Sequence, residues 1–308
     1  MSVKEETLKR YNYFHCQSQD PVPIGQNRIS YIDFIELWNE FLASVPYKVT
    51  KEIIINDTSD TFPIYKYVIT PKDFKKTIFL VAGMHGNEYE AYWGLLRLMK
   101  ELYKDEQSNI TLNRLRNNVR FIIIPVLNPY GMQNDLRRNY QGIDANYNYD
   151  LDRNVYTIFS GPYAFSSNEP KAVKLVCDEY EGEIDGHIEY HTDPYHGDEK
   201  YNYLESEPQC PAYAVAYKLT LDEREWIKKE YKKIADPGFV IWENNACTIF
   251  RYMWQKRGIP SLVCESGTNG VAASGTSTLM KSTVDFYMNT LITLAYELCF
   301  NNIDLGNK

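Results

Sequence analysis

The chain has 308 residues, of which 44% are hydrophobic and 24% are charged, and its formal net charge is −8. This length and composition are those of a globular protein that can bury a sizeable core. The negative charge argues against nucleic acid or an anionic membrane as the main partner.

Residues 1–27 are polar and contain the stretch DPVPIG, so we interpret them as an N-terminal arm ahead of one domain over residues 28–308. The opening sequence has no apolar core of signal-peptide length, and no segment reaches the roughly 18 apolar residues that span a bilayer. The six cysteines lie far apart without CxxC spacing, which is typical of reduced, buried thiols. We therefore expect a cytoplasmic protein without a membrane partner, and its oligomeric state stays open.

The first predicted elements are a helix and a β-hairpin. The stretch YIDFIELWNEFLA follows Ser30, a residue type that favours helix N-caps, and its apolar residues recur at helical spacing. The side chains expected on one face of this helix are Ile32, Ile35, Trp38 and Leu42. Two β-rich stretches follow, KEIIIND and FPIYKYVIT, and the turn residues between them predict a hairpin.

The rest of the chain alternates predicted strands and helices. The apolar runs KTIFLVAG and NVRFIIIPVLNP lack polar alternation, as expected for strands that are buried on both faces. Helices are predicted over residues 88–103, 168–180, 220–234 and 281–300, and short strands at GHIEYHT, PGFVIW and PSLVCES. This order predicts an α/β fold with a mixed, mostly parallel central sheet sandwiched by helices.

The sequence HGNE follows the first buried strand and places His85 three residues before Glu88. An isolated HxxE is compatible with an ordinary strand-to-helix turn, in which Gly83 and Gly86 permit the turn and Glu88 favours the positive helix N-terminus. It is also compatible with two of the three protein ligands of a catalytic zinc site. Such sites lie beyond the carboxyl ends of strands in α/β sheets, where this motif stands.

A third ligand is expected from the end of another strand. The stretch GHIEYHT offers His187 and His191, which point to the same face of a strand but lie about 13 Å apart at the usual rise per residue. Only one of them can therefore reach the metal. We prefer His191, at the strand exit, and interpret His187 as a structural residue and His196 as a loop residue.

A hydrolytic zinc site also needs a base that takes a proton from the attacking water. Glu265 follows the buried strand PSLVC and precedes a loop rich in Gly, Ser and Thr, so it is the candidate. Standing alone, such a residue could be a solvated carboxylate at a strand end.

Taken together, these stretches resemble the zinc carboxypeptidase family, whose wider superfamily includes the succinylglutamate desuccinylases and aspartoacylases. Six motifs occur in the family's order: HGNE at 85–88, NPYG at 128–131, RRNYQGIDANYN at 137–148, SSNEP at 166–170, IEYHT at 188–192 and VCESG at 263–267. The segment R-x-N-x-x-G-x-D-x-N and the S-x-E-P that follows it are the most specific of them.

The resemblance implies a role for several residues. His85, Glu88 and His191 would bind one zinc ion. Glu265 would act first as the general base and then as the proton donor to the leaving group. Arg137 falls on the family's arginine that polarises the scissile carbonyl and stabilises the oxyanion, a role that suits a guanidinium because it is always charged.

Substrate recognition departs from the family pattern at one position. Asn146 falls on the family's asparagine that helps to bind the substrate's terminal carboxylate, but Tyr147 stands where carboxypeptidases have a clamping arginine. A phenol supplies one hydrogen bond rather than a charged bidentate fork. The open candidates for a replacement cation are Arg138, Arg153 and Arg251. For the family's mobile-loop tyrosine ahead of the catalytic glutamate, Tyr252 is the nearest candidate.

The sequence therefore predicts a zinc metallopeptidase, a carboxypeptidase-like hydrolase of peptide or peptide-like amide bonds with altered recognition of the C-terminal carboxylate. One alternative is a deacylase of N-acyl amino acids like the desuccinylases and aspartoacylases, although SSNEP and the later spacing favour the peptidase branch. Another is a non-catalytic binding protein that kept the fold, which the presence of all three ligands and the base disfavours.

Overall fold

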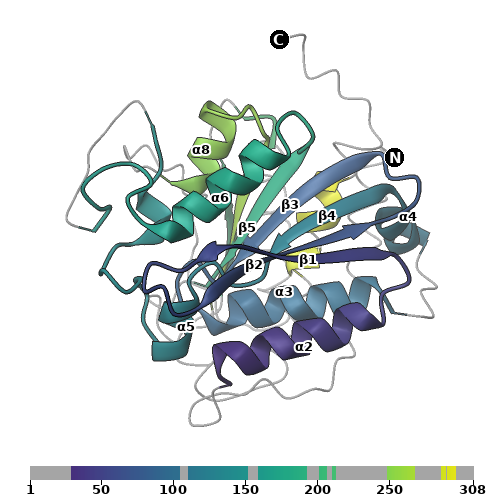
Figure 1. Cartoon of the computed structure of the whole chain (residues 1–308). Coiled ribbons are helices and arrows are strands. Elements are labelled where there is room, and N and C mark those ends of the chain that lie inside the picture. Colours follow the sequence, from purple (N-terminus) through teal and green to yellow (C-terminus); the bar gives the residue numbers. More distant parts are fainter. Residues whose placement is uncertain are drawn as a thin grey trace.

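The computed structural model describes residues 29–104, 110–151, 159–192, 201–206, 210–212, 248–267, 286–288 and 290–295. Within these residues, seven strands form one sheet with helices on both sides (Figure 1). The strands are β1 (Lys48–Asn56), β2 (Pro63–Thr70), β3 (Lys76–Ala82), β4 (Val119–Ile124), β5 (Gly186–His191), β6 (Tyr201–Glu205) and β7 (Ser261–Gly267). Their order in the sheet is β1-β2-β4-β3-β5-β7-β6.

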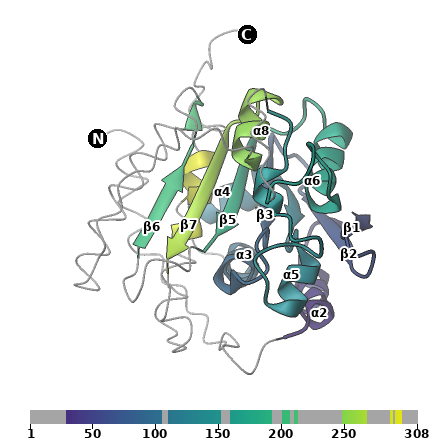
Figure 2. The same cartoon turned by 90° about the vertical axis from the view of Figure 1, so that its left-hand side faces the viewer.

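The directions of the strands confirm the predicted mixed, mostly parallel sheet. The middle strands β4, β3, β5 and β7 pair in parallel, while β2 and β6 run in the opposite direction. The predicted hairpin is the antiparallel pair β1–β2. Parallel neighbours end at the same edge of a sheet, so the carboxyl ends of β3, β5 and β7 lie together at one edge (Figure 2).

The two faces of the sheet carry separate hydrophobic cores. Helices α2 (Tyr31–Ala43), α3 (Tyr89–Leu102) and α4 (Ile110–Asn118) cover one face, and α6 (Asn168–Glu179) and α8 (Ile249–Gln255) cover the other. Along β3, Ile78 and Leu80 pack into the first core while Phe79 and Val81 pack into the second. The strand therefore has no polar face, which explains its continuous apolar sequence.

The predicted helices agree with the structure wherever it describes them. Residues 88–103 and 168–180 correspond to α3 and α6, and the described part of the predicted closing helix, 286–288 and 290–295, is helical. The arm over residues 1–27, the helix over 220–234, the strand PGFVIW, His196 and Arg153 lie outside the described residues. Among the helices that are described, none has the length and apolar character needed to cross a membrane.

Helix α2 begins as predicted, because the Oγ of Ser30 accepts a hydrogen bond from the backbone N of Asp33. The expected inner face is wrong for Ile32, which is 48% exposed. The reason is that aromatic side chains of α2 form the face of this helix that packs on the core. Tyr31 is fully buried, and Phe34 packs edge-on against two aromatic rings of α3, which turns Ile32 toward solvent.

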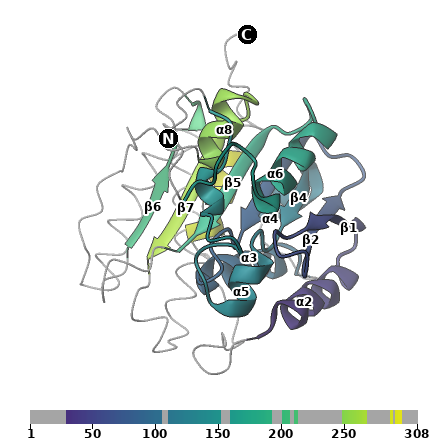
Figure 3. The same ribbon diagram turned by 60° about the vertical axis from the view of Figure 1, so that its left-hand side comes forward.

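A short helix, α5 (Pro129–Asn134), explains the NPYG motif and lies beside the start of α3 (Figure 3). A Cβ added to Gly86 would lie 1.9 Å from the carbonyl carbon of Gly131, so the HGNE and NPYG backbones are in direct contact. Asn128 accepts a hydrogen bond from the backbone N of Gly131 at 2.9 Å and donates one to the carbonyl of Arg137 at 3.3 Å. The motif therefore joins the HGNE turn to the segment that carries Arg137.

Candidate metal centre and active site

The candidate site is built where β3 and β5 end. After β3, Gly83 adopts a left-handed conformation with φ of +63° and turns the chain toward His85. Glu88 follows at the N-cap of α3. His191 is the last residue of β5, which pairs in parallel with β3. Strand pairing thus brings together two parts of the sequence that are far apart along the chain.

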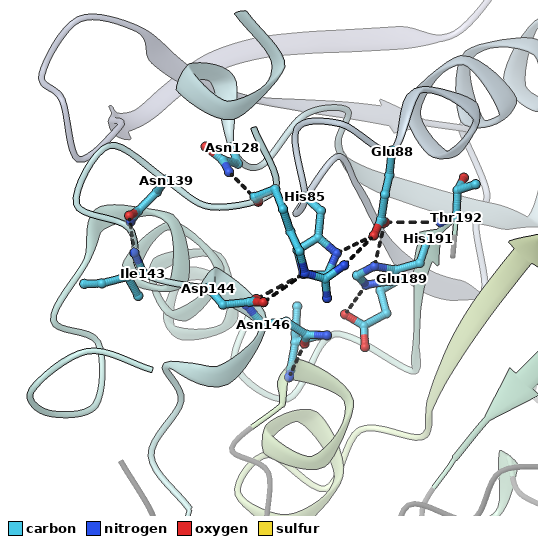
Figure 4. A network of polar contacts seen from close by, with 12 residues as sticks. His85, Glu88, Asn128, Asn139, Ile143, Asp144, Asn146, Glu189, His191 and Thr192 are labelled. Atoms are coloured by element: carbon cyan, nitrogen blue, oxygen red, sulfur yellow. Dashed lines mark hydrogen bonds and ion pairs between the residues drawn. The ribbon is translucent and has the colours of Figure 1, made fainter. Parts of the chain in front are cut away.

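The structure brings His85, Glu88 and His191 into one cluster (Figure 4). Their ligand atoms all lie within 4.8 Å of one another, and all three side chains are buried. Glu88 lies between the histidines, with Oε1 2.6 Å from Nδ1 of His85 and Oε2 3.0 Å from Nδ1 of His191. Two imidazoles and one carboxylate form a donor set that catalytic zinc sites use.

Each of the two histidines meets a second carboxylate at its other ring nitrogen. The Nε2 of His85 lies 3.0 Å from Oδ1 of Asp144, and the Nε2 of His191 lies 3.4 Å from Oε2 of Glu189. Both rings therefore turn Nδ1 toward the centre of the cluster. Carboxylates orient metal-bound histidines in this way, so the residues present fit a zinc ion.

Sequence reasoning missed Asp144 and Glu189 as parts of the site, although both carried a signal. Asp144 is the aspartate of the R-x-N-x-x-G-x-D-x-N motif. Glu189 stands two residues before His191 on a strand and therefore shares its face. His187, on the same face, is held by the Oγ of Ser261 at 2.8 Å from its Nδ1 and is buried against an aromatic ring of β3, which agrees with a structural role.

Arg137 lies beside the cluster. Its Nη1 donates to Oε1 of Glu88 and its Nε donates to Oδ2 of Asp144, each over 3.2 Å. The side chain is 28% exposed, whereas both carboxylates are buried. The predicted oxyanion-binding arginine thus contacts one candidate metal ligand, Glu88. It also contacts Asp144, the carboxylate that contacts His85.

The charges of the cluster reinforce one another. Burial raises the pKa of Glu88, but His85 and His191 lower it by more, so this pKa lies well below its ordinary value. The pKa of Asp144 is also lowered, because His85 and Arg137 outweigh the effect of burial. Both carboxylates are therefore ionised at neutral pH, as is required of groups that bind a cation or orient its ligands.

Glu265 stands at the same sheet edge. It lies on β7 directly across from His191 in the parallel register of β5 and β7. Burial lowers the pKa of His191, but Glu88 and, more weakly, Glu265 raise it above its ordinary value. The candidate base is thus a neighbour of a candidate metal ligand, and it is partly exposed.

Asn146 and Tyr147 directly follow Asp144 in a short 3₁₀ helix, η2 (Ala145–Tyr147). The backbone N of Asn146 donates to Oδ1 of Asp144 at 3.1 Å, and its side-chain Oδ1 lies 3.5 Å from the first backbone N of α8. Burial lowers the pKa of Arg137, but the two carboxylates beside it and Tyr147 raise it above its ordinary value. Tyr147 therefore lies within electrostatic reach of Arg137.

Tyr252, whose expected role in substrate binding stays a prediction, is a residue of the second hydrophobic core. Tyr252 lies in α8, is 3% exposed, and packs against Tyr149 and Phe165. Its hydroxyl accepts a hydrogen bond from Nε of Arg257 at 2.7 Å. Burial raises its pKa to about 12. The ring thus packs in the core that residues of α6 and α8 share.

Two of the arginines considered as a replacement clamp are described. The guanidinium carbon of Arg138 lies 3.7 Å from the ring centroid of Phe159, and the carbonyl of Phe159 accepts a hydrogen bond from the backbone N of Asp144. Arg251 lies in the first turn of α8, two residues after Ile249, whose backbone N faces Asn146. Both arginines thus belong to segments that border the site.

Comparisons with known proteins bear on the fold and the family. The family model of zinc carboxypeptidases matches residues 36–220, and a search of curated protein sequences finds no match. The metallo-carboxypeptidase of Burkholderia cenocepacia is 20% identical over 85% of this chain and 69% of its own, with a TM-score of 0.61. Thrombin-activatable fibrinolysis inhibitor is 13% identical over 96% of this chain and 80% of its own, with a TM-score of 0.71.

The bovine thrombin-activatable fibrinolysis inhibitor, in complex with a tick carboxypeptidase inhibitor, is 13% identical over 88% of this chain and 97% of its own, with a TM-score of 0.68. At these identities the solved structures establish the fold. The family model spans more than half of the 308 residues and includes the segments with all three candidate ligands, which confirms the resemblance seen in the motifs. The chain belongs to the zinc carboxypeptidase family, a family of metallopeptidase-type hydrolases.

Proposed function

We propose that this protein is a zinc-dependent hydrolase of peptide or peptide-like amide bonds in which recognition of the substrate's C-terminal carboxylate is altered. The observation that carries the proposal is the buried cluster of His85, Glu88 and His191 with Arg137 beside it. A zinc ion held by these three ligands would polarise the scissile carbonyl and lower the pKa of the attacking water.

Glu265 would serve as the base. Its carboxylate takes a proton from the attacking water, whose oxygen forms the new bond to the carbonyl carbon. When the carbon–nitrogen bond breaks, the same carboxyl group gives that proton to the departing amine. The register that sets Glu265 beside His191 supports this assignment.

Arg137 would stabilise the negative charge that develops on the carbonyl oxygen. Its Nε and Nη1 are held by Asp144 and Glu88, so the guanidinium is oriented before a substrate arrives. Because Asp144 also contacts His85, one carboxylate sets the position of a metal ligand relative to the oxyanion-binding group.

Tyr147 would weaken the recognition of a free C-terminal carboxylate. A phenol in the place of a guanidinium loses roughly 2 kcal/mol or more of charge-assisted hydrogen bonding, unless another cation enters the pocket. Peptides that end in a free aliphatic or aromatic residue should therefore be poor substrates. Peptides with amidated, modified or atypically linked ends should compete better than they do for other family members.

The reaction is tested with zinc-loaded wild type and Glu265→Gln. The variant should keep its fold and its zinc but lose hydrolysis by several orders of magnitude, because an amide is a poor base. Arg137→Ala should lower kcat by on the order of a hundredfold, as expected for the loss of one oxyanion donor. Glu40→Gln, at an exposed position of α2, serves as the control. An active Glu265→Gln enzyme would end this mechanism.

The specificity is tested with free-acid and amide-capped versions of the same peptides. Wild type should show little preference for the free acids, and Tyr147→Arg should shift the ratio of kcat/KM values toward them. Brisk, strongly acid-selective cleavage by the wild type would mean that another residue has taken over the carboxylate clamp.

A further inference from the structure

The S-x-E-P motif carries a buried carboxylate that the proposed reaction does not use. Glu169, in the first turn of α6, is 0% exposed. It accepts hydrogen bonds from the backbone N of Thr58 at 3.0 Å, from Oγ1 of Thr58 at 2.6 Å and from Nδ2 of Asn139 at 2.7 Å. All three of these donors are uncharged groups. Burying a carboxylate costs free energy, which hydrogen-bond donors must offset. The three donors around Glu169 therefore indicate that the fold holds this side chain in one place.

The partner Asn139 organises the loop that carries the active-site residues. Its Oδ1 accepts hydrogen bonds from the backbone N atoms of Gln141 and Ile143 at 3.1 and 2.9 Å, and its own backbone N donates to the carbonyl of Ile143 at 3.0 Å (Figure 4). The turn is completed by Gly142, which adopts φ of +74°. Because Oδ1 is engaged in this way, the Asn139 amide can present only its NH₂ group to Glu169.

The two flanks of this loop hold Arg137 and Asp144, which contact each other over 3.2 Å. Asp144 continues to Nε2 of His85 at 3.0 Å, and Arg137 continues to Oε1 of Glu88 at 3.2 Å. Hydrogen bonds and short backbone segments therefore connect Glu169, through Asn139 and its loop, with two of the candidate metal ligands. Displacement of such supporting groups by about 1 Å can weaken a site strongly.

We infer that Glu169 is a positioning residue, which acts through Asn139 to hold Asp144 against His85 and Arg137 against Glu88. The inference rests on the proposed zinc site. It also gives a physical meaning to the two most specific motifs of the sequence, since the Asn139–Glu169 hydrogen bond joins one to the other.

The chemistry of Glu169 explains why an amide cannot replace it. Three donors converge on its two oxygens, and Asn139 cannot rotate its amide without losing the two loop hydrogen bonds. The NH₂ group introduced by Glu169→Gln must therefore face another donor, either the backbone N of Thr58 or the NH₂ of Asn139. A donor facing a buried donor is an unsatisfied pair.

The test measures zinc affinity by competition with a chromophoric chelator, after circular dichroism and thermal melting have established that each variant is folded. Glu169→Gln should bind zinc roughly tenfold more weakly, because Asp144 no longer fixes His85. Asp178→Asn removes an exposed carboxylate from the same helix and should bind zinc like the wild type. If Glu169→Gln does not fold, Asn139→Asp provides the comparison, because it keeps an acceptor for the loop but sets a carboxylate oxygen against Glu169, and it should also weaken zinc binding.

Two further variants separate positioning from a general loss of stability. Combining Glu169→Gln with Asn139→Asp reverses the polarity of the hydrogen bond, because the new amide donates to the new carboxylate, and most of the lost affinity should return. In an Asp144→Asn background, Glu169→Gln should cause a smaller further loss than it does in the wild type, since the branch through Asp144 is already interrupted and only the branch through Arg137 and Glu88 remains.

Additive losses in that background, or wild-type zinc affinity in folded Glu169→Gln, would overturn the inference and leave the proposed function standing. A wild type that binds no zinc would instead remove the proposed function, and this inference with it.

Discussion

At the scale of single residues, the candidate metal centre depends on carboxylates that would not touch the metal. Asp144 contacts His85 and Glu189 contacts His191, each at the ring nitrogen that faces away from Glu88. A carboxylate in this position fixes the orientation of the imidazole and makes its other nitrogen a better ligand. The affinity of the centre is therefore expected to depend on residues outside the three ligands.

The first prediction compares the loss of zinc affinity caused by substituting the three ligands with the loss caused by substituting the two carboxylates that contact the histidines. Alanine in place of any of the three ligands should abolish zinc binding, whereas Asp144→Asn and Glu189→Gln should weaken it by about 10- to 100-fold. His187→Ala should retain it, because His187 contacts Ser261 instead. Equilibrium dialysis with zinc measures all of these variants. If His187→Ala emptied the site and His191→Ala did not, the choice of the third ligand would be wrong.

The second prediction concerns His187 and pH. Burial lowers the pKa of its imidazole from 6.5 to about 3. Between pH 3 and 6.5, His187 is therefore protonated in the unfolded chain but neutral in the folded chain. The free energy of unfolding should therefore fall as the pH is lowered from 6.5 toward 3, with a contribution of at most about 1.4 kcal/mol per pH unit. In His187→Gln this contribution should vanish. Urea denaturation of both metal-free proteins between pH 4 and 7 tests it, and identical pH dependences would contradict it.

At the scale of elements, the site depends on how closely two turns approach each other. Gly86 in the HGNE turn touches the backbone of Gly131 in α5, and a Cβ at Gly131 would lie 2.7 Å from the backbone carbonyl oxygen of Leu136. Backbone atoms cannot move aside as the end of a flexible side chain can. Both glycines are thus needed for α5 to reach the end of β3 and to bring Arg137 toward the cluster.

The third prediction follows from this contact. Gly86→Ala should push α5 away from the HGNE turn, and should therefore lower both the melting temperature and the affinity for zinc. Gly182→Ala is the matched control, since nothing lies within 4 Å of its added Cβ and only its positive φ of +75° is strained, at a cost of about 1–2 kcal/mol. Gly182→Ala should keep wild-type zinc affinity. Equal zinc affinities in the two folded variants would contradict the proposed role of the contact.

At the scale of the whole molecule, the metal would join segments that only the sheet brings together. His85 and Glu88 follow β3, whereas His191 ends β5, and these strands are neighbours although a long stretch of sequence separates them. A ligand that binds the folded chain and not the unfolded chain shifts the folding equilibrium by mass action. Zinc is therefore expected to stabilise the fold as a whole.

The fourth prediction is the size of this effect. At a free zinc concentration of about 100 times Kd, the free energy of unfolding should rise by about 2.7 kcal/mol relative to chelator-treated protein. His191→Ala should show no such rise. Thermal denaturation with zinc and with chelator measures both proteins, and a zinc-dependent shift that persists in His191→Ala would point to a different binding site.

The amino-acid sequence by itself determined the local elements and the chemical types of the site. Secondary structure depends mostly on near neighbours along the chain. The sequence therefore predicted the apolar strand β3 and the start of α2 at Ser30. The same information identified His85, Glu88 and His191 as a possible set and preferred His191 to His187. The rise per residue of a strand showed that only one of the two can reach the metal, and the position of His191 at the strand exit decided between them.

Only the tertiary structure decided which side of each element faces the core and which groups meet. It turned Ile32 outward because Tyr31 and Phe34 of the same helix form the inner face that packs on α3, and it put Tyr252 into packing between α6 and α8. It also set Asp144 against His85 and Glu169 against Asn139. These contacts depend on strand register and helix packing, which are settled by the burial of the whole core, because no short stretch of sequence contains both partners.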